Sequence, residues 1–256
     1  NPSVSVDGDF EFVDFEPHSR GLNPIFVTEG FALYDKPSGV LVHPQNRHTP
    51  YSLNDEIKLA FGRDANVAHR IDQETSGLVL VGTNKESERL LKIMFENRHV
   101  TKRYLAFVQG HLENSMLIDE PLYRRDDPSA AVRMIVLVDP RGKSSQTHIH
   151  PLKYYPELNA TLIQASPLTG RQHQIRAHLF HVKHPIIGDP IYSMEEKDAV
   201  RYLDRVMSKE ERFEKTKASR LLLHANQLEF IYEENKYVLY SKDNFIEECF
   251  KAMQFN

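Results

Sequence analysis

The chain has 256 residues, of which 40% are hydrophobic and 27% charged, and its formal net charge at pH 7 is −4. These values are those of a globular protein with one large or two small domains, and no apolar run approaches the ~18 residues of a membrane span. The first ten residues lack the basic and apolar regions of a secretory signal, and the single cysteine, Cys249, excludes an internal disulfide. We therefore expect a protein of a reducing compartment, the cytoplasm.

The charge is distributed unevenly along the chain. Residues 1–20 contain five acidic residues and one arginine, so this segment alone accounts for the net charge of −4. Residues 141–184 contain six Lys or Arg, one Glu and six histidines. A local cationic surface, which an RNA partner needs, is therefore compatible with the negative total, although a solvated basic face would give the same pattern.

The first half of the chain predicts strands and one amphipathic helix. Residues 31–44 predict a strand, a Pro-Ser-Gly turn and a second strand that ends at Pro44. Residues 84–98 predict a helix with Asn84 as its N-cap and with apolar residues at helical spacing. Two further strands are predicted at residues 77–83 and 101–110.

The second half mixes the two kinds of element again. Residues 159–182 predict a strand, a loop and a helix, and residues 195–217 predict a charge-dense helix with one apolar side. Residues 227–232 and 236–241 predict strands. Because regular strand–helix alternation is missing, we expect an α+β fold with a largely antiparallel sheet.

The segment AHRIDQETSG, residues 68–77, places Asp72 between Ile71 and an apolar strand. An ionised carboxylate near a core is costly unless it is paired, so this position predicts a partner cation. The same letters resemble the His-Arg-Asp of a protein-kinase catalytic loop. The chain lacks the glycine-rich loop and the Asp-Phe-Gly motif of a kinase, which argues against that interpretation.

Four histidines close together in sequence raise the possibility of a zinc site, because their spacing brings some of them onto one helix face. The only cysteine is distant, and the helix itself contains no Glu or Asp. We therefore interpret them as solvated or hydrogen-bonding side chains and expect no metal. A metal-dependent nuclease is disfavoured because the chain has no carboxylate cluster. The four are His173, His178, His181 and His184.

Several motifs, taken in order, resemble one known family. They are YDKPSGVLVHP from residue 34, HRIDQETSGLVLVGTN from residue 69, LTGRQHQIRAHLFHVKHPIIGDPIY from residue 168 and RLLLHA from residue 220. Together they resemble the RluA-type family of RNA pseudouridine synthases, to which H-R-[LI]-D-x-x-T-S-G is highly specific. KRYLAFVQG, from residue 102, is also similar to a strand motif of that family.

The resemblance implies a pseudouridine synthase fold, with helices flanking the sheet and a central active-site cleft. It implies an enzyme that isomerises uridines of structured RNA, either ribosomal or transfer RNA, to pseudouridine. The reaction breaks the glycosidic bond, turns the uracil and joins its carbon 5 to the sugar, so no electrons or groups enter or leave. We therefore expect no cofactor. Separately, we expect a monomer that binds structured RNA and no membrane.

By resemblance, three residues are catalytic. Asp72 is the carboxylate that either attacks the anomeric carbon or takes part in proton abstraction from the sugar, and the sequence does not choose between these routes. Arg176 is its partner cation, and Tyr104 lies against the base and assists removal of the proton from carbon 5. The simpler alternatives are a turn residue for Asp72, a phosphate contact or a surface charge for Arg176, and a core aromatic for Tyr104.

Four further residues are expected to bind the substrate. Arg70 would stack into the space left by a flipped uridine and donate to phosphates. Arg171 and Lys36 are candidates for phosphate contact, and His69 is expected to support the loop. A non-catalytic RNA chaperone on the same scaffold is the rival interpretation, but such a protein has no need of a buried carboxylate with its partners.

Two features depart from the family pattern. Many relatives carry a small N-terminal RNA-binding domain, whereas here the core is preceded by a segment of only about 25 residues with a net negative charge. We expect an acidic extension at residues 1–24 and one catalytic domain over residues 25–256. The segment between Tyr192 and Arg220 is longer than the typical family loop, and the sequence assigns it no function.

Overall fold

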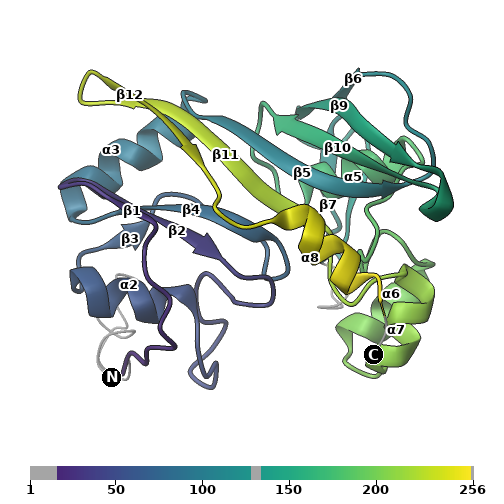
Figure 1. The fold of residues 1–256 in the computed structure, drawn as a ribbon, viewed down its shortest axis with the longest axis horizontal. Helices are drawn as coiled ribbons and strands as arrows, with labels where there is room; N and C mark the ends of the chain where they lie inside the picture. Colours follow the sequence, from purple (N-terminus) through teal and green to yellow (C-terminus); the bar gives the residue numbers. More distant parts are fainter. Residues whose placement is uncertain (1–15, 128–133, 255–256) are drawn as a thin grey trace.

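A long, twisted β-sheet runs through residues 16–127 and 134–254, the parts of the chain that this computed structural model describes (Figure 1). Within these residues its strands follow the order β1-β2-β4-β11-β5-β10-β9-β6, with β12 paired to β11 and β3 to β4, while β7 and β8 form a separate pair. The described strands pair antiparallel except β4 with β11, so the predicted α+β fold with a largely antiparallel sheet is confirmed.

The described strands and helices have the following bounds. The strands are β1 (Phe26–Val27), β2 (Phe31–Lys36), β3 (Asn66–Val67), β4 (Ser76–Gly82), β5 (Thr101–Gln109), β6 (Met116–Asp119), β7 (Leu122–Arg124), β8 (Val136–Val138), β9 (Gln146–Tyr155), β10 (Ala160–Pro167), β11 (Leu223–Tyr232) and β12 (Asn235–Tyr240). The helices are α2 (Leu53–Phe61), α3 (Lys85–Glu96), the short 3-10 helix η1 (Pro156–Leu158), α5 (Gln174–His181), α6 (Glu196–Leu203), α7 (Lys209–Thr216) and α8 (Phe245–Ala252).

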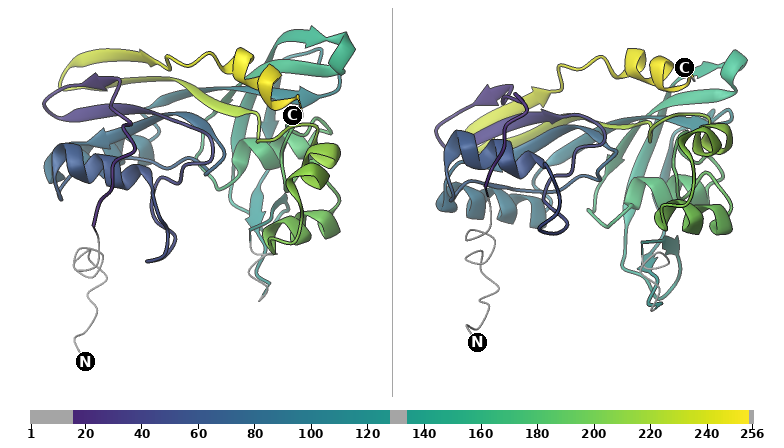
Figure 2. Two further views of the ribbon diagram at one scale, coloured as in Figure 1. Left: turned by 60° about the horizontal axis from the view of Figure 1, so that its bottom comes forward. Right: turned by 90° about the horizontal axis from the view of Figure 1, so that it is seen from below.

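Helices cover both faces of the sheet, which is why its central strands are apolar on both sides. On β4, Leu80 lies in the same apolar cluster as Leu91 of α3, whereas Val79 and Val81 lie with Ile57 of α2. Since successive side chains of a strand point to opposite faces, α2 and α3 pack on opposite sides of β4. In the other half of the molecule, α8 lies on one side of the sheet and α5 on the other (Figure 2).

β11 lies between β4 and β5 and joins the two halves of the sheet. Ala225 of β11 is in register with Gly77 of β4 on one side and with Tyr104 of β5 on the other. Gly77 has a φ of +108°, and a Cβ at this position would lie 2.2 Å from the carbonyl oxygen of Ala225. The approach of β11 to β4 therefore requires glycine, and it brings the loop that enters β4 toward Tyr104.

Residues 40–43 do not form the predicted second strand. The carbonyls of Leu41 and Val42 accept hydrogen bonds from the backbone N–H groups of Leu53 and Asn54, at 2.8 and 3.0 Å. These donors belong to the first turn of α2, which has no partner for them within the helix. The alternating apolar pattern is thus used to cap a helix that the sequence did not predict.

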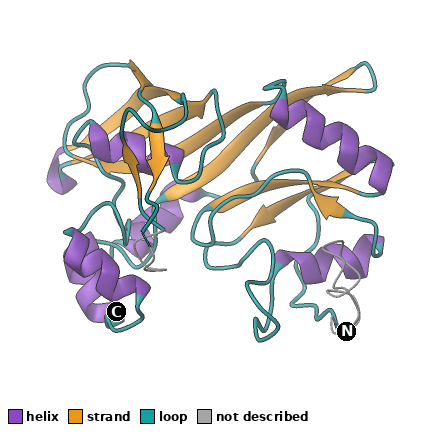
Figure 3. Ribbon diagram, turned by 180° about the vertical axis from the view of Figure 1, so that it is seen from behind, coloured by secondary structure: helices purple, strands orange, loops and turns teal. Residues whose placement is uncertain are grey.

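Segment 195–217 forms two helices rather than the one predicted. α6 ends at Leu203, Arg205 has a left-handed φ of 61°, and Ser208 then begins α7 as its N-cap. Val206, one of the apolar residues of this segment, is 63% exposed in the connection. α6 and α7 lie side by side at one end of the molecule (Figures 1 and 3).

Part of the predicted N-terminal extension packs against the domain. The backbone N–H of His18 donates to the carboxylate of Asp55, and that of Leu22 donates to Glu56, both at 2.9 Å. The two acceptors lie in the first turn of α2. The remainder of the extension, residues 1–15, lies outside the described residues.

Candidate active site

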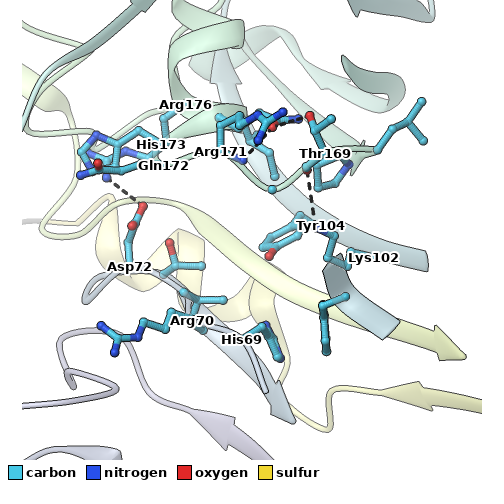
Figure 4. A pocket seen from close by; sticks show the side chains of 18 of the residues that line it. His69, Arg70, Asp72, Lys102, Tyr104, Thr169, Arg171, Gln172, His173 and Arg176 are labelled. Carbon is cyan, nitrogen blue, oxygen red and sulfur yellow. Dashed lines mark hydrogen bonds and ion pairs between the residues drawn. The ribbon is translucent and has the colours of Figure 1, made fainter. Parts of the chain in front are cut away.

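A pocket of about 840 Å³ opens where the two halves of the molecule meet. Its walls come from the loop before β4, the end of α3, the start of β5 and the loop that leads into α5. The structure brings six of the seven predicted site residues to this pocket (Figure 4). The six are His69, Arg70, Asp72, Tyr104, Arg171 and Arg176.

Asp72 and Arg176 form an ion pair, so Asp72 has the partner cation that the sequence predicted. Nη1 of Arg176 donates to Oδ2 of Asp72 at 3.0 Å, and Figure 4 shows the carboxylate pointing toward the arginine. The Asp72 side chain is 34% exposed, whereas that of Arg176 is 6% exposed. The carboxylate therefore faces the pocket, and the buried cation lies behind it.

A second carboxylate, Asp189, holds the other side of Arg176. Nε and Nη2 of the arginine donate to the two oxygens of Asp189 at 2.8 and 2.9 Å. Asp189 also accepts from the backbone N–H groups of Ile191 and Tyr192. Such a two-point pair fixes the plane of the guanidinium, which leaves Nη1 directed at Asp72.

The pair controls the charge of Asp72. Burial acts to raise the pKa of this carboxyl, but the charge and hydrogen bond of Arg176 outweigh it and hold the pKa below its ordinary value of 3.8. For Tyr104, burial, joined by the charge of Asp72, raises the pKa of the phenol above its ordinary value. At neutral pH the pocket therefore presents an anionic carboxylate and a neutral phenol.

The side chains that are predicted to contact RNA differ in their exposure and in their hydrogen bonds. Arg70 is exposed at the pocket, and its guanidinium is turned away from Tyr104 (Figure 4). Arg171 donates to the carbonyl of Ser144, and its half-buried side chain also lines the pocket. His69 accepts from the backbone N–H of Leu80 and stacks on the ring of Phe95.

Lys36 is the predicted site residue that the structure does not bring to the pocket. Its side chain is fully buried, and its ammonium donates to the carbonyls of Pro37, Val40 and Gln73. Burial, joined by the charge of Arg220, lowers the pKa of this amine to about 7. Lys36 thus ties the turn after β2 to the loop of Asp72, and its placement corrects the expected phosphate contact.

The four clustered histidines do not converge on one point. His173 bonds the hydroxyl of Tyr192, His178 bonds Thr147, and His184 bonds the carbonyl of Gln109. Within residues 16–127 and 134–254, no three His, Cys, Asp or Glu side chains are grouped as a metal site requires. In the same residues, no helix has the length and apolarity needed to cross a bilayer.

Comparison with known proteins identifies the family of the chain. The family model described as RNA pseudouridylate synthase matches residues 30–181, which include both Asp72 and Arg176. The chain belongs to this family. It is therefore a pseudouridine synthase, as the motifs predicted.

Relatives of this pseudouridine synthase match most of the chain. An RNA pseudouridine synthase of Helicobacter pylori (strain ATCC 700392 / 26695) is 38% identical over 231 residues, which cover 90% of this chain and 75% of the relative. The tRNA pseudouridine synthase C of Salmonella typhimurium is 34% identical, with 77% and 75% covered. The ribosomal large subunit pseudouridine synthase D of Nitrosomonas europaea is 33% identical, with 85% and 60% covered.

Solved structures show the same fold. Human RNA Pseudouridylate Synthase Domain Containing 1 superposes with a TM-score of 0.70, covering 92% of this chain and 89% of that protein, at 24% sequence identity. Human RNA Pseudouridylate Synthase Domain Containing 4 gives a TM-score of 0.67 at 22% identity, with 90% and 92% covered. The likeness at this level of identity is one of architecture.

Sequence reasoning missed two residues of this synthase's site. Asp189 lies in the quoted segment GDPIY, but a lone Asp before Pro gave no reason to place it beside Arg176. Lys102 lines the pocket from β5, two residues before Tyr104, and burial lowers the pKa of its amine. The alternation of β5 was a usable signal, because it places residues 102 and 104 on the same face.

Proposed function

We propose that this synthase isomerises specific uridines of ribosomal or transfer RNA to pseudouridine, with Asp72 as the catalytic carboxylate. The observation that carries the proposal is the pairing of a pocket-facing Asp72 with a buried Arg176, at 3.0 Å. A carboxylate that stays ionised at neutral pH is ready either to attack the anomeric carbon or to take part in removing a proton from the sugar. A turn residue would not need a buried cation.

The remaining steps of the isomerisation need one further side chain, for which we propose Tyr104. The bond between the sugar and uracil N1 breaks, the bond between the sugar and carbon 5 forms, and the proton of carbon 5 is lost while N1 regains one. Tyr104 lies in the same pocket as a neutral phenol. Its ring gives the turned uracil a face to lie against, and its hydroxyl relays the proton of carbon 5 by accepting that proton while it gives its own to water.

The names of the relatives support the proposed substrate class. Two of the relatives are named for transfer RNA and ribosomal RNA. A target base inside folded RNA has to leave its stack to reach a pocket, at a cost of about a few kcal/mol. We assign Arg70 to the space that the base leaves, with Arg171 as a phosphate contact and His69 as support for the loop.

Release of tritium from carbon 5 tests the proposal directly. Ribosomal and transfer RNA would be prepared from cells that lack the gene and are fed uridine tritiated at carbon 5. The wild-type protein should release tritium from one of these pools, and Asp72→Asn should release at most about a hundredth as much while it binds the RNA equally well. Absence of release from both pools would refute the proposed substrate, and an active Asp72→Asn would refute the proposed residue.

A further inference from the structure

One arginine of the segment without an assigned function contacts the loop of Asp72. Both terminal nitrogens of Arg212, on α7, donate to the carboxylate of Glu74, which follows Asp72 by two residues. The Arg212 side chain is 11% exposed and that of Glu74 is 20% exposed. The contact is therefore a two-point, largely desolvated ion pair and not a solvated surface pair.

The same guanidinium also contacts the turn that precedes Asp189. Nη2 of Arg212 donates to the carbonyl of Gly188 at 2.9 Å. Gly188 immediately precedes Asp189, the residue that fixes the plane of Arg176. Arg212 thus connects the loop that carries Asp72 with the turn that orients its partner cation.

Other contacts make Glu74 the meeting point of three segments. The hydroxyl of Tyr202, on α6, donates to Glu74 at 3.0 Å, and the backbone N–H of Leu221, just before β11, donates to it at 2.8 Å. Burial acts to raise the pKa of Glu74, but the hydrogen bonds and charge of Arg212 outweigh it and hold the pKa below its ordinary value. Glu74 is therefore an anion that needs these donors.

The loop of Asp72 depends on such contacts because it has no regular structure of its own. Residues 68–75 lie between β3 and β4, outside any helix or strand. Neither Glu74 nor Arg212 lines the pocket. A change at either residue therefore acts on the reaction through the segments that the two hold, which are the loop of Asp72, the turn at Gly188 and the start of β11.

We propose that Arg212 is a positioning residue, which sets the geometry of the Asp72–Arg176 pair by holding Glu74 and Gly188 on one guanidinium. The segment that contains α6 and α7 then has a function, because Arg212 of α7 holds the two backbone segments that carry Asp72 and orient Arg176. This inference rests on the proposed catalytic role of Asp72. A displacement of about 1 Å at a catalytic group can cost on the order of a hundredfold in rate.

The test compares two arginines of the same helical pair. Arg212→Met removes the contact with the catalytic loop, and Arg201→Met removes a similar pair with Glu211 that lies within the α6–α7 segment. With the tritiated RNA as substrate, we expect Arg212→Met to lower kcat at least tenfold with little change in KM. Arg212→Lys, which keeps the charge, should recover part of kcat, and Arg201→Met should keep the wild-type value.

A second measurement does not depend on turnover. The carboxyl carbon of Asp72 is followed by ¹³C NMR as the pH is lowered, with its signal assigned from the spectrum of Asp72→Asn. A displaced Asp72 loses part of its contact with Arg176, so its pKa should rise in Arg212→Met and stay unchanged in Arg201→Met. Glu74→Gln, which keeps the size of the side chain, replaces Arg212→Met if that variant does not fold.

The two readouts separate this inference from the proposed function. If the wild-type protein releases no tritium, the proposed function fails, while the titration of Asp72 still measures positioning. If Arg212→Met and Glu74→Gln keep both the wild-type kcat and the wild-type pKa of Asp72, Arg212 merely stabilises the fold and the inference is wrong. A raised KM with unchanged kcat would also overturn it, because that result indicates a role in RNA binding.

Discussion

Arg176 and Asp189 form a buried two-point ion pair, with side chains 6% and 0% exposed. The pair is the more buried of the two that Arg176 makes, since Asp72 opens onto the pocket. The positive charge behind Asp72 is therefore fixed independently of Asp72 itself. Asp189 therefore stabilises the buried arginine, and Asp72 is left to face the pocket as the proposed catalytic group.

Arg176→Met should destabilise the fold strongly. Removing one partner of a buried pair commonly costs about 3–5 kcal/mol, because the other charge is left without compensation. Here the stranded charge is Asp189, so Asp72→Asn should not restore the lost stability, whereas Asp189→Asn should restore part of it. Urea unfolding of the single and double variants measures the coupling. Full recovery with Asp72→Asn would show that Asp72 is the main partner.

Neither Asp72 nor Tyr104 should give a limb in the pH dependence of turnover near neutrality. The pKa of Asp72 lies below 3.8, and burial raises the pKa of Tyr104 above 10.0, so neither group changes its charge near neutrality. We expect kcat on the tritiated RNA to be flat from about pH 5 to about pH 7 wherever the protein stays folded. A fall above about pH 7 would come from Lys36, which holds the loop of Asp72 and whose pKa is about 7. An acidic limb centred near pH 6 in folded protein would mean that Asp72 is not held ionised by Arg176.

Stability should fall as the pH drops from about 6.5 to about 4. Burial, joined by the Arg176 charge, lowers the pKa of His173 to about 4, and burial, joined by Arg220, lowers that of His224 to about 4. Between these pKa values and about pH 6.5, each histidine is neutral in the folded chain and protonated in the unfolded chain. Each proton taken up on unfolding therefore lowers the free energy of unfolding by about 1.4 kcal/mol for every unit that the pH falls.

The variant His224→Gln tests how much of this pH dependence of stability comes from one histidine. His224 bonds the hydroxyls of Ser76 and Ser241, and an amide can replace both contacts. The free energy of unfolding of His224→Gln should depend on pH less steeply than that of the wild type, by about one proton near pH 5. Parallel curves for the two proteins would show that His224 stays protonated in the folded state.

Local patterns predicted much of the fold, because they act over short distances. The apolar stretch at β4, the alternation at β5 and the capped helix after Asn84 all appear where the sequence placed them. The strand predicted at residues 40–43 failed because its carbonyls bind the start of α2. The helix predicted at residues 195–217 is broken because Arg205 adopts a left-handed conformation and Ser208 begins a new cap.

The sequence predicted only those site residues that lie in a recognisable motif. Asp72, Tyr104 and Arg176 lie in quoted motifs, and the structure brings them to one pocket. Lys36 lies in such a motif too, yet three carbonyls bind its ammonium in the interior. Arg212 meets Glu74 across 138 positions of sequence, a distance at which no periodicity or spacing provides a signal.

Gly77→Ala should damage both stability and turnover, and Gly62→Ala provides a matched control. Both glycines have positive φ, +108° and +89°, so a side chain at either position costs about 1–3 kcal/mol of backbone strain. A Cβ at Gly77 would in addition lie 2.2 Å from the carbonyl oxygen of Ala225, whereas a Cβ at Gly62 meets no atom within 4 Å. The difference between the two variants therefore isolates the collision between β4 and β11.

We expect Gly77→Ala to lose about 1–3 kcal/mol more of unfolding free energy than Gly62→Ala, the usual cost of overpacking. Because Ala225 also pairs with Tyr104, moving β11 away from β4 shifts the tyrosine relative to Asp72. Tritium release by Gly77→Ala should accordingly fall at least tenfold under conditions where both variants are folded, and Gly62→Ala should keep the wild-type rate. Equal stability and equal turnover in the two variants would mean that the close contact of β4 with β11 does not set the geometry of the site.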